Sequence, residues 1–260
     1  MANILRGVGK ITNSANQTFE WDLESTPPTA GQGLIYEGGV WVPKNVGSPS
    51  DPTTNHAEIR LGFNNNGNNS GTSTLTSVTP SGTYSYTTSN KTGTHAIDFG
   101  QSQNGYVNIQ TASTSRTYSM GGWFYITRGN TNVRSYIVDF RGADQTAGYW
   151  LFDNLNSMTI LGHDGEDVFS HTVPTNQWVH WVLTSDGSSN MKFYENGALV
   201  RTSSKYSAKL STTVVLGTYN GNRSSSGTYY LNGKVDNFFL ALSEYNSDQV
   251  QAIYNSQEVY

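Results

Sequence analysis

From Ala57 onward the chain is a succession of short apolar runs, each of strand length and each followed by a turn-forming segment. Gly, Asn, Asp and Ser dominate these connections, which favours an antiparallel all-β sandwich over βαβ units. The expected strands are Glu58–Phe63, Ala96–Phe99, Tyr106–Ile109, Tyr118–Ile126, Tyr136–Phe140, Tyr149–Phe152, Ser157–Leu161, Val168–Thr172, Trp178–Thr184, Met191–Glu195, Ala198–Thr202, Thr213–Leu216, Tyr229–Val235 and Asn237–Leu242.

Two local signals complete this prediction. Asn196-Gly197 separates two strand candidates and predicts a type I′ hairpin, because both central residues of that turn need positive φ. Only the C-terminal end reads as a helix, with Ser247 expected to cap its first turn and Asp248 placed to suit the helix dipole. Its expected apolar face consists of Val250, Ile253 and Tyr254.

The composition agrees with a folded β-rich chain and excludes several functions. The 260 residues include 30 Ser, 30 Thr, 26 Asn and 16 Tyr but only 15 basic and 19 acidic residues. A net charge of −4 without a basic run offers no surface for a nucleic-acid backbone. No apolar stretch approaches the ~20 residues of a membrane helix, and Met1–Lys10 lacks the core of a signal peptide. The absence of cysteine excludes disulfides, zinc ribbons and thiol catalysis.

The first 55 residues differ from the rest and are expected to form an extended arm ahead of a sandwich domain at residues 56–260. Five of the seven prolines lie in this arm, which favours turns and edge-type strands. Gly33–Val42 predicts a tight hairpin with Gly38-Gly39 at its turn. So small a segment must pack on the main domain or on another chain. The residues expected to anchor or oligomerise it are Trp21, Leu34, Tyr36 and Trp41.

The order of the motifs resembles a known family. Residues 57–257 are similar to the laminin-G-like branch of the concanavalin-A-like lectin/glucanase superfamily, which implies a two-sheet jelly roll with one short C-terminal helix. The resemblance rests on about eight short motifs in the family's order, each of low specificity alone. They include Arg60-Leu-Gly-Phe-Asn-Asn-Asn, His95-Ala-Ile-Asp-Phe-Gly, Gly105-Tyr-Val-Asn-Ile, Met120-Gly-Gly-Trp-Phe-Tyr-Ile, Trp178-Val-His-Trp-Val-Leu-Thr, Met191-Lys-Phe-Tyr-Glu-Asn-Gly, Val215-Leu-Gly and Leu231-Asn-Gly-Lys-Val-Asp-Asn-Phe-Phe-Leu.

The arm carries a second resemblance. Residues 26–43, Thr-Pro-Pro-Thr-Ala-Gly-Gln-Gly-Leu-Ile-Tyr-Glu-Gly-Gly-Val-Trp-Val-Pro, are similar to a short module of phage tail fibres and other virion appendages. That module joins or trimerises β-rich segments. The resemblance therefore implies a bacteriophage virion-surface protein, with other virion proteins or further copies of the chain as partners of the arm.

Glycan binding is the function expected of the sandwich, since a pyranose offers an apolar face to aromatic rings and a rim of hydroxyls to polar side chains. Tyr149–Asp153 and the turn after Asp186 are candidate segments, as is the loop that begins at Tyr219. The alternative is that Tyr149, Trp150 and Phe152 belong to the core and that the loop is a solvated connection. The candidate glycan-binding residues are Tyr219, Asn220, Asn222, Arg223, Trp150 and Asp153.

The sequence does not support a metal site, and no cofactor is expected. Some relatives bind Ca²⁺, yet Gly217–Thr228 contains no acidic residue. Asp98 and Asp236 match positions that are sometimes acidic in the family, and both equally fit hydrogen bonding at strand ends. The densest polar cluster, His163-Asp164-Gly165-Glu166-Asp167 with His171, contains an Asp-Gly turn pair and is interpreted as a charged hairpin turn.

No catalytic constellation is found, so the protein is expected not to be an enzyme. Retaining glucanases of the superfamily carry Glu-x-Asp-x-x-Glu, whose first two carboxylates share one face of a strand. Glu166 and Asp167 are adjacent and must face opposite sides, and the chain has no Gly-x-Ser-x-Gly.

These arguments predict a non-enzymatic protein at the virion surface. Its sandwich mediates adhesion to host or environmental glycans, and its arm attaches it to the particle. The alternatives are a structural decoration protein without a sugar site, a laminarinase-type hydrolase and a secreted lectin.

Overall fold

The computed structural model describes strands of the N-terminal region and residues 57–71, 77–100, 105–111, 114–127, 134–141, 148–153, 155–188, 191–219 and 229–256. The chain divides into two compact units, Met1–Asp51 and Pro52–Tyr260, close to the expected boundary after residue 55.

The N-terminal unit contains two antiparallel strand pairs. β1 (Gly9–Thr12) pairs with β2 (Thr18–Trp21), and β3 (Gly33–Glu37) pairs with β4 (Val40–Lys44). The pairing of Glu37 with Val40 confirms the hairpin expected around Gly38-Gly39. The expected anchoring residues lie in these strands, but their side chains fall outside the described residues, and their role stays a prediction. They are Trp21 in β2, Leu34 and Tyr36 in β3, and Trp41 in β4.

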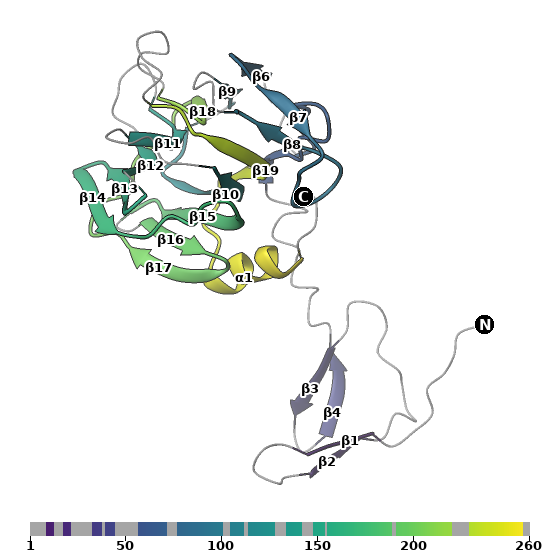
Figure 1. Cartoon of the computed structure of the whole chain (residues 1–260). Coiled ribbons are helices and arrows are strands. Elements are labelled where there is room, and N and C mark those ends of the chain that lie inside the picture. The colour runs from purple at the N-terminus through teal and green to yellow at the C-terminus, as the bar shows by residue number, and fades with distance from the viewer. Residues whose placement is uncertain are drawn as a thin grey trace. The chain divides into compact units, whose positions relative to one another are not determined.

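The C-terminal unit is the predicted antiparallel sandwich of two sheets (Figure 1). The eight-stranded sheet has the order β17-β16-β15-β10-β19-β8-β7, with β5 also paired to β19. Its strands are β17 (Ala198–Thr202), β16 (Met191–Glu195), β15 (Trp178–Asp186), β10 (Thr117–Ile126), β19 (Gly233–Ala241), β8 (Ala96–Asp98), β7 (Ser85–Thr87) and β5 (Ala57–Leu61).

The seven-stranded sheet packs against it with the order β14-β13-β12-β11-β18-β9-β6. Its strands are β14 (Gly165–Ser170), β13 (Ser157–Gly162), β12 (Tyr149–Asp153), β11 (Arg134–Asp139), β18 (Thr213–Leu216), β9 (Tyr106–Gln110) and β6 (Ser77–Ser81). Strands consecutive in sequence are neighbours from β11 to β14 and from β15 to β17. β18 lies between β11 and β9, and β19 lies between β10 and β8.

Three details differ from the expected strands. The polar edge strands β6 and β7 carry mainly Ser, Thr and Tyr and have no apolar run to reveal them. β14 begins at Gly165 rather than Val168, because Glu166 and Asp167 pair with Leu161 and Ile160 of β13 and their charges are compensated by Arg134 and Arg201. The two strands expected between Tyr229 and Leu242 are one strand, β19. Its polar interruption is a β-bulge, where Asn237 adopts a φ of 48°.

The core lies between the sheets and is rich in aromatic side chains. Trp150 from the seven-stranded sheet and Trp181 from the eight-stranded sheet are both fully buried, with ring centroids 6.1 Å apart. Phe193 packs edge-on against Trp150 at 5.6 Å, and Phe124 lies 5.4 Å from Trp181. The inward side chains of both sheets therefore form one continuous apolar layer.

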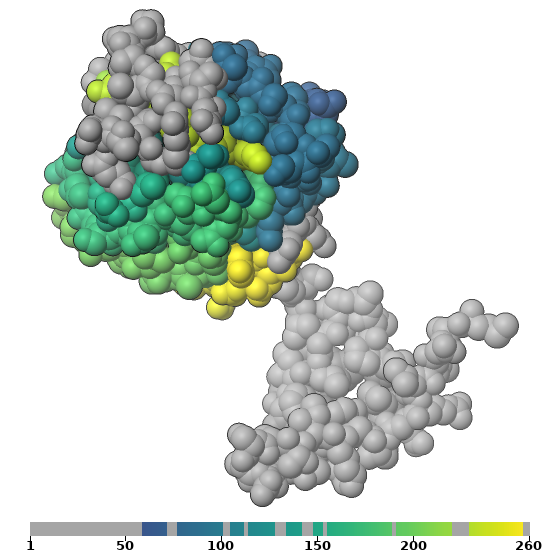
Figure 2. All heavy atoms as spheres, in the orientation of Figure 1, coloured from purple at the N-terminus to yellow at the C-terminus, as the bar shows by residue number. Residues whose placement is uncertain are grey.

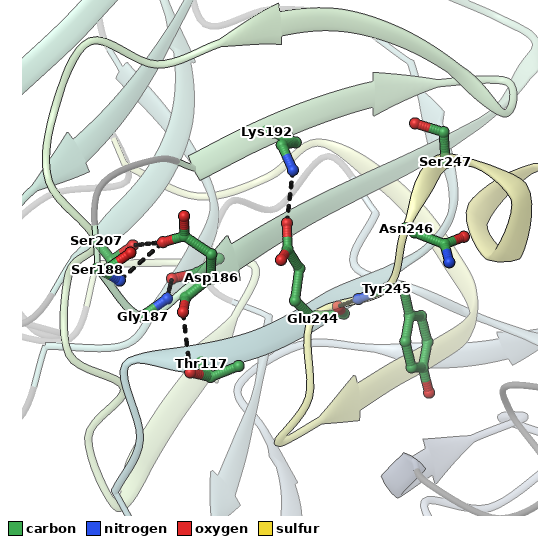
Figure 3. Close-up of polar contacts among 12 residues, drawn as sticks. Thr117, Asp186, Gly187, Ser188, Lys192, Ser207, Glu244, Tyr245, Asn246 and Ser247 are labelled. Carbon is green, nitrogen blue, oxygen red and sulfur yellow. Dashed lines mark hydrogen bonds and ion pairs between the residues drawn. The ribbon is translucent and has the colours of Figure 1, made fainter.

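Helix α1 (Ser247–Ser256) covers part of the outer face of the eight-stranded sheet. Its buried residues Val250 and Ile253 pack on Val182, Tyr194 and Phe239, as the expected apolar face requires. In Figure 2 its yellow atoms lie against the green atoms of the later strands. An ion pair of 2.7 Å between Lys192 and Glu244 attaches the preceding segment to β16 (Figure 3).

The helix cap differs from the prediction. Asn246, not Ser247, caps the first turn: its Oδ1 accepts the Gln249 amide N–H at 2.9 Å. The Gln249 Oε1 in turn accepts the Asn246 amide N–H at 2.9 Å. This reciprocal capping box satisfies two amide groups that Ser247 leaves unpaired.

The hairpin at Asn196-Gly197 is confirmed. Asn196 and Gly197 have φ values of 50° and 83°, and Glu195 pairs with Ala198 across them. Both residues thus take the left-handed conformation that the two-residue turn requires.

Candidate functional site

A group of four tyrosines lies on the outer face of the seven-stranded sheet, around β11, β12 and β18. We call Tyr136, Tyr149, Tyr219 and Tyr229 the tyrosine cluster. Strand alternation places Tyr149 and Leu151 on this face, because their neighbours Trp150 and Phe152 point into the core. Tyr136 is the hub, with its ring centroid 5.2 Å from Tyr149, 5.3 Å from Tyr219 and 6.0 Å from Tyr229.

A guanidinium group ties three of these rings together. The Arg141 Cζ lies 4.3 Å from the ring centroid of Tyr149 and 4.6 Å from that of Tyr219, distances typical of cation–π contacts. Arg141 also donates two hydrogen bonds to the buried carboxylate of Asp139, at 3.0 and 2.6 Å. Burial lowers the pKa of Arg141, but the Asp139 carboxylate outweighs it and raises the pKa. The guanidinium is thus fixed in place and charged.

A second ion pair forms the accessible rim of the cluster. Arg134 Nη1 lies 2.9 Å from Glu166 Oε1, and the two side chains are 39% and 32% exposed. The Tyr149 hydroxyl donates a hydrogen bond to the same carboxylate. Partial burial alone would raise the pKa of Glu166, but the hydrogen bonds from Tyr149 and Arg134 lower it, so the carboxylate is ionised at neutral pH. Burial raises the pKa of Tyr149, which stays a neutral donor.

The cluster combines the groups that a sugar ring requires. Tyr136 and Tyr149 are almost fully buried at its base, Tyr219 is half-buried and Tyr229 is 36% exposed. The exposed rings offer apolar faces, and the rim offers carboxylate oxygens as acceptors and guanidinium N–H groups as donors. Each of the two arginines has a carboxylate partner, so these four charges cancel and the surface suits an uncharged hydroxyl-rich ligand.

Two of the expected glycan-binding side chains belong to the described part of the chain, Tyr219 and Trp150, and they lie in different places. Tyr219 belongs to the tyrosine cluster, whereas Trp150 is fully buried in the core. The expectation for Trp150 is wrong, because adjacent residues of β12 face opposite sides of the sheet and Tyr149 is the outward one. The side chain of Asp153 and the residues Asn220, Asn222 and Arg223 lie outside the described part of the chain, and their role stays a prediction.

Sequence reasoning missed Tyr136, Tyr229 and Arg141. Tyr136 and Arg141 flank the apolar run of β11, and Tyr229 stood at the start of an expected strand. The pattern Tyr149-Trp150-Leu151-Phe152 is apolar at every position, so it carries no alternation that tells the core face from the outer face.

The acidic cluster near His163 separates in the structure. Gly162 pairs with Gly165, so a hairpin turn is present as expected, but its two residues are His163 and Asp164, one position earlier than the expected Asp164-Gly165. Glu166 faces Arg134, while Asp167 accepts two hydrogen bonds from Arg201 of β17, at 3.1 and 2.8 Å. His171 lies elsewhere, 3.0 Å from Glu195. Since β14 and β17 belong to different sheets, the Asp167–Arg201 pair joins the two edges of the sandwich. Among the described residues, no three His, Asp or Glu side chains gather as metal ligands.

Asp98 and Asp236 both accept backbone N–H groups, Asp98 at the end of β8 and Asp236 from within β19. Asp98 Oδ1 accepts the Gly100 amide N–H at 2.7 Å. Asp236 Oδ2 accepts the amide N–H groups of Lys91 and Thr92 at 2.8 and 2.9 Å. Burial raises the pKa of Asp236 to about 6. The two carboxylates thus hold neighbouring loops against the eight-stranded sheet.

The two-sheet jelly roll, with polar and aromatic side chains on its outer face, defines a lectin-like sandwich. Residues 99–251 match the family described as the concanavalin A-like lectin/glucanases superfamily, and the chain belongs to this family. A search of curated proteins gives no significant match.

Solved structures of the same fold include toxin binding domains. One is from botulinum neurotoxin type C, whose cell entry is described as dependent upon interaction with two ganglioside molecules (TM-score 0.61, 15% identity, 80% of this chain and 53% of that chain). Another is the binding domain of Paraclostridial Mosquitocidal Protein 1 (TM-score 0.61, 13% identity, 77% and 52%). A third is the binding domain of botulinum neurotoxin DC in complex with SialylT (TM-score 0.59, 14% identity, 80% and 52%). The chain spans about half the length of these structures.

No helix among the described residues has the length and apolar character needed to cross a membrane.

Proposed function

We propose that the protein is a non-enzymatic glycan-binding module that recognises a neutral sugar at the tyrosine cluster. The observation that carries this proposal is the pair of accessible rings Tyr219 and Tyr229, whose centroids lie 5.8 Å apart, in the same tyrosine cluster whose Tyr149 hydroxyl donates to the Glu166 carboxylate of the Arg134–Glu166 pair. A pyranose ring stacks on Tyr229 and Tyr219, and its hydroxyls donate to Glu166 and accept from Arg134. Toxin binding domains of the same fold that engage gangliosides or SialylT support a sugar as the ligand.

Two variants with a matched control test this proposal. A glycan array of the full chain first identifies a sugar, and calorimetry then measures its affinity. We expect Tyr229→Ala and Glu166→Gln each to weaken binding by about tenfold, the effect of losing one stacking or hydrogen-bond contact. Tyr206→Ala removes a tyrosine that is 56% exposed and outside the cluster, and it should leave the affinity unchanged. An array without any bound sugar at high protein concentration would favour a purely structural decoration protein instead.

The absence of enzymatic activity belongs to the same proposal. Glu166 is ion-paired with Arg134, and its neighbour Asp167 is directed to Arg201 across the edge of the sandwich. Two carboxylates arranged in this way do not flank one glycosidic bond. Release of reducing sugar from any β-glucan by the pure protein would contradict this part.

The residues 1–55 are proposed to attach the module to a bacteriophage virion or to further copies of the chain, as a trimer. The resemblance of residues 26–43 to tail-fibre modules supports this, as does the separation of Met1–Asp51 as a compact unit. Deletion of residues 1–55 should give a folded sandwich that no longer joins the particle. The ratio of the protein to other virion proteins in purified particles is the readout, and retained incorporation would contradict attachment through the arm. Many attached copies would amplify a low affinity per domain.

A further inference from the structure

A second aromatic surface lies on the opposite side of the sandwich from the tyrosine cluster. On the outer face of the eight-stranded sheet, α1 covers one part, and a strip of aromatic and lysine side chains occupies another. We call Trp123, Tyr125, Trp178, Lys91 and Lys234 the tryptophan–lysine strip. Strand alternation places the β10 and β15 members outward, because Phe124, Ile126 and Val179 point into the core.

The register of three strands sets the order of this strip. Tyr125 of β10 pairs directly with Trp178 of β15 on one side and with Lys234 of β19 on the other. Tyr125 and Trp178 meet edge to face, with ring centroids 5.5 Å apart. The Lys234 ammonium lies 4.8 Å from the Tyr125 ring centroid. Lys234, Tyr125 and Trp178 therefore lie side by side in one row across the sheet.

Next to this row, Lys91 and Trp123 form a second contact between an ammonium group and an aromatic ring. The Lys91 ammonium sits 4.4 Å from the ring centroid of Trp123, which is 4% exposed and packs on His180 and Tyr254. The Trp178, Tyr125, Lys91 and Lys234 side chains are all half-buried, so they remain open to a ligand. The strip therefore consists of four accessible side chains around the buried ring of Trp123.

The two lysines of the strip have no ion-paired carboxylate among the described residues, as is also true of Arg116, Lys205 and Lys209. Lys192, Arg134, Arg141 and Arg201 are each ion-paired. Among the described residues, the Lys91 ammonium has no ion pair, and Lys234 Nζ donates instead to the Ser89 hydroxyl at 2.8 Å. The nearest acidic side chains in the strand register, Asp98 and Asp236, accept backbone N–H groups. The strip therefore places two ammonium groups without an ion pair next to aromatic faces.

We propose that the tryptophan–lysine strip is a second binding site, and that its ligand is an acidic saccharide of the hexuronate type. The sugar ring stacks on the Trp178 and Tyr125 faces, and its carboxylate pairs with the Lys234 ammonium. A further uronate in the same oligomer reaches Lys91. A neutral sugar leaves both ammonium groups without a counter-charge, and a small anion leaves the aromatic rings uncovered, so neither uses both halves of the strip.

This site is independent of the one proposed on the tyrosine cluster, because the two lie on the outer faces of different sheets. The test uses oligogalacturonate as the probe and the corresponding neutral oligogalactoside as its control, with affinity measured by calorimetry on the full chain. The wild type should bind oligogalacturonate, and the neutral oligomer should bind at least about tenfold more weakly. Raising the salt concentration should weaken oligogalacturonate binding further, since the contact includes a charge pair.

Variants separate the two sites. We expect Trp178→Ala and Lys234→Met each to weaken oligogalacturonate binding by about tenfold or more, while Lys234→Arg retains it. Lys209→Met removes an exposed lysine outside the strip, and Tyr229→Ala alters the other site; both should bind oligogalacturonate like the wild type. Thermal unfolding of each variant shows whether it is folded, and Lys234→Met provides the decision if Trp178→Ala is not. A wild type that does not bind oligogalacturonate, or that binds the neutral oligomer equally well, overturns the proposal. Unchanged affinity of folded Lys234→Met also overturns it.

Discussion

The core contains two tryptophans that are equally buried but differ in one hydrogen bond, so comparing them measures the contribution of that bond to stability. Trp150 and Trp181 are both fully buried and lie 6.1 Å apart. The Trp181 Nε1 donates to Glu195 Oε2 at 2.8 Å, whereas the Trp150 Nε1 has no protein partner. We predict that Trp181→Phe destabilises the protein more than Trp150→Phe does.

The size of the difference follows from the two indole groups. Either substitution removes similar apolar contacts and leaves a similar cavity, and these costs cancel in the comparison. Burial alone would raise the pKa of Glu195, but hydrogen bonds from His171 and Trp181 lower it, so its carboxylate is ionised at neutral pH. A hydrogen bond to a charged group contributes about 1.5–3 kcal/mol, while Trp150→Phe removes a donor that is already unpaired. Trp181→Phe should therefore reduce the free energy of unfolding by about 2 kcal/mol more.

Urea unfolding at pH 7, followed by far-ultraviolet circular dichroism, measures both free energies. A double-mutant cycle with Glu195→Met, which removes the acceptor, isolates the hydrogen bond, and its coupling energy should be about 2 kcal/mol. Equal destabilisation by the two substitutions, or a coupling energy near zero, would refute the reasoning. Since Trp150 faces the core, folded Trp150→Phe should also keep the wild-type affinity at the tyrosine cluster.

Two further predictions concern a buried histidine and the helix cap. Burial lowers the pKa of His180 from 6.5 to about 3, so between these values the unfolded chain takes up a proton that the native chain does not, and stability falls as the pH falls. His180→Phe should make the dependence of unfolding free energy on pH shallower below pH 6.5, by up to about 1.4 kcal/mol per pH unit in urea titrations; an unchanged slope would contradict it. Asn246→Ala should cost about 1 kcal/mol in the same assay, since it removes the cap of α1, whereas Ser247→Ala should cost less. The reverse order would show that the capping box is not the stabilising contact.

Much of the fold is predictable from local patterns. The Asn196-Gly197 turn, the hairpin around Gly38-Gly39 and the apolar face of α1 depend on residues close together in sequence, and the structure confirms all three. The cap of α1 is also local, but the capping residue is Asn246 and not the expected Ser247. Gln249 stands three residues after Asn246 and completes a capping box with it. Strands β6 and β7 were missed, since polar edge strands depend on pairing with β9 and β8 rather than on an apolar run.

The candidate sites depend on long-range geometry. Tyr219 was predicted as a ligand contact, but its neighbours Tyr136, Tyr149 and Tyr229 come from other segments and meet only after the seven-stranded sheet has formed. The tryptophan–lysine strip likewise requires the register of β10 with β15 and β19. The spacing of residues along the chain predicts neither the contacts of the tyrosine cluster nor the strand register of the tryptophan–lysine strip.

The sequence by itself determined the class of fold, the number of short strands to within a few, and the separation of the arm from the sandwich, because turns and apolar periodicity act over a few residues. Only the tertiary structure decided which face each aromatic side chain occupies. A strand such as Tyr149–Asp153 that is apolar at every position is compatible with either orientation. Pairing with its neighbours sent Trp150 into the core and left Tyr149 beside Arg141 and Glu166 on the outer face.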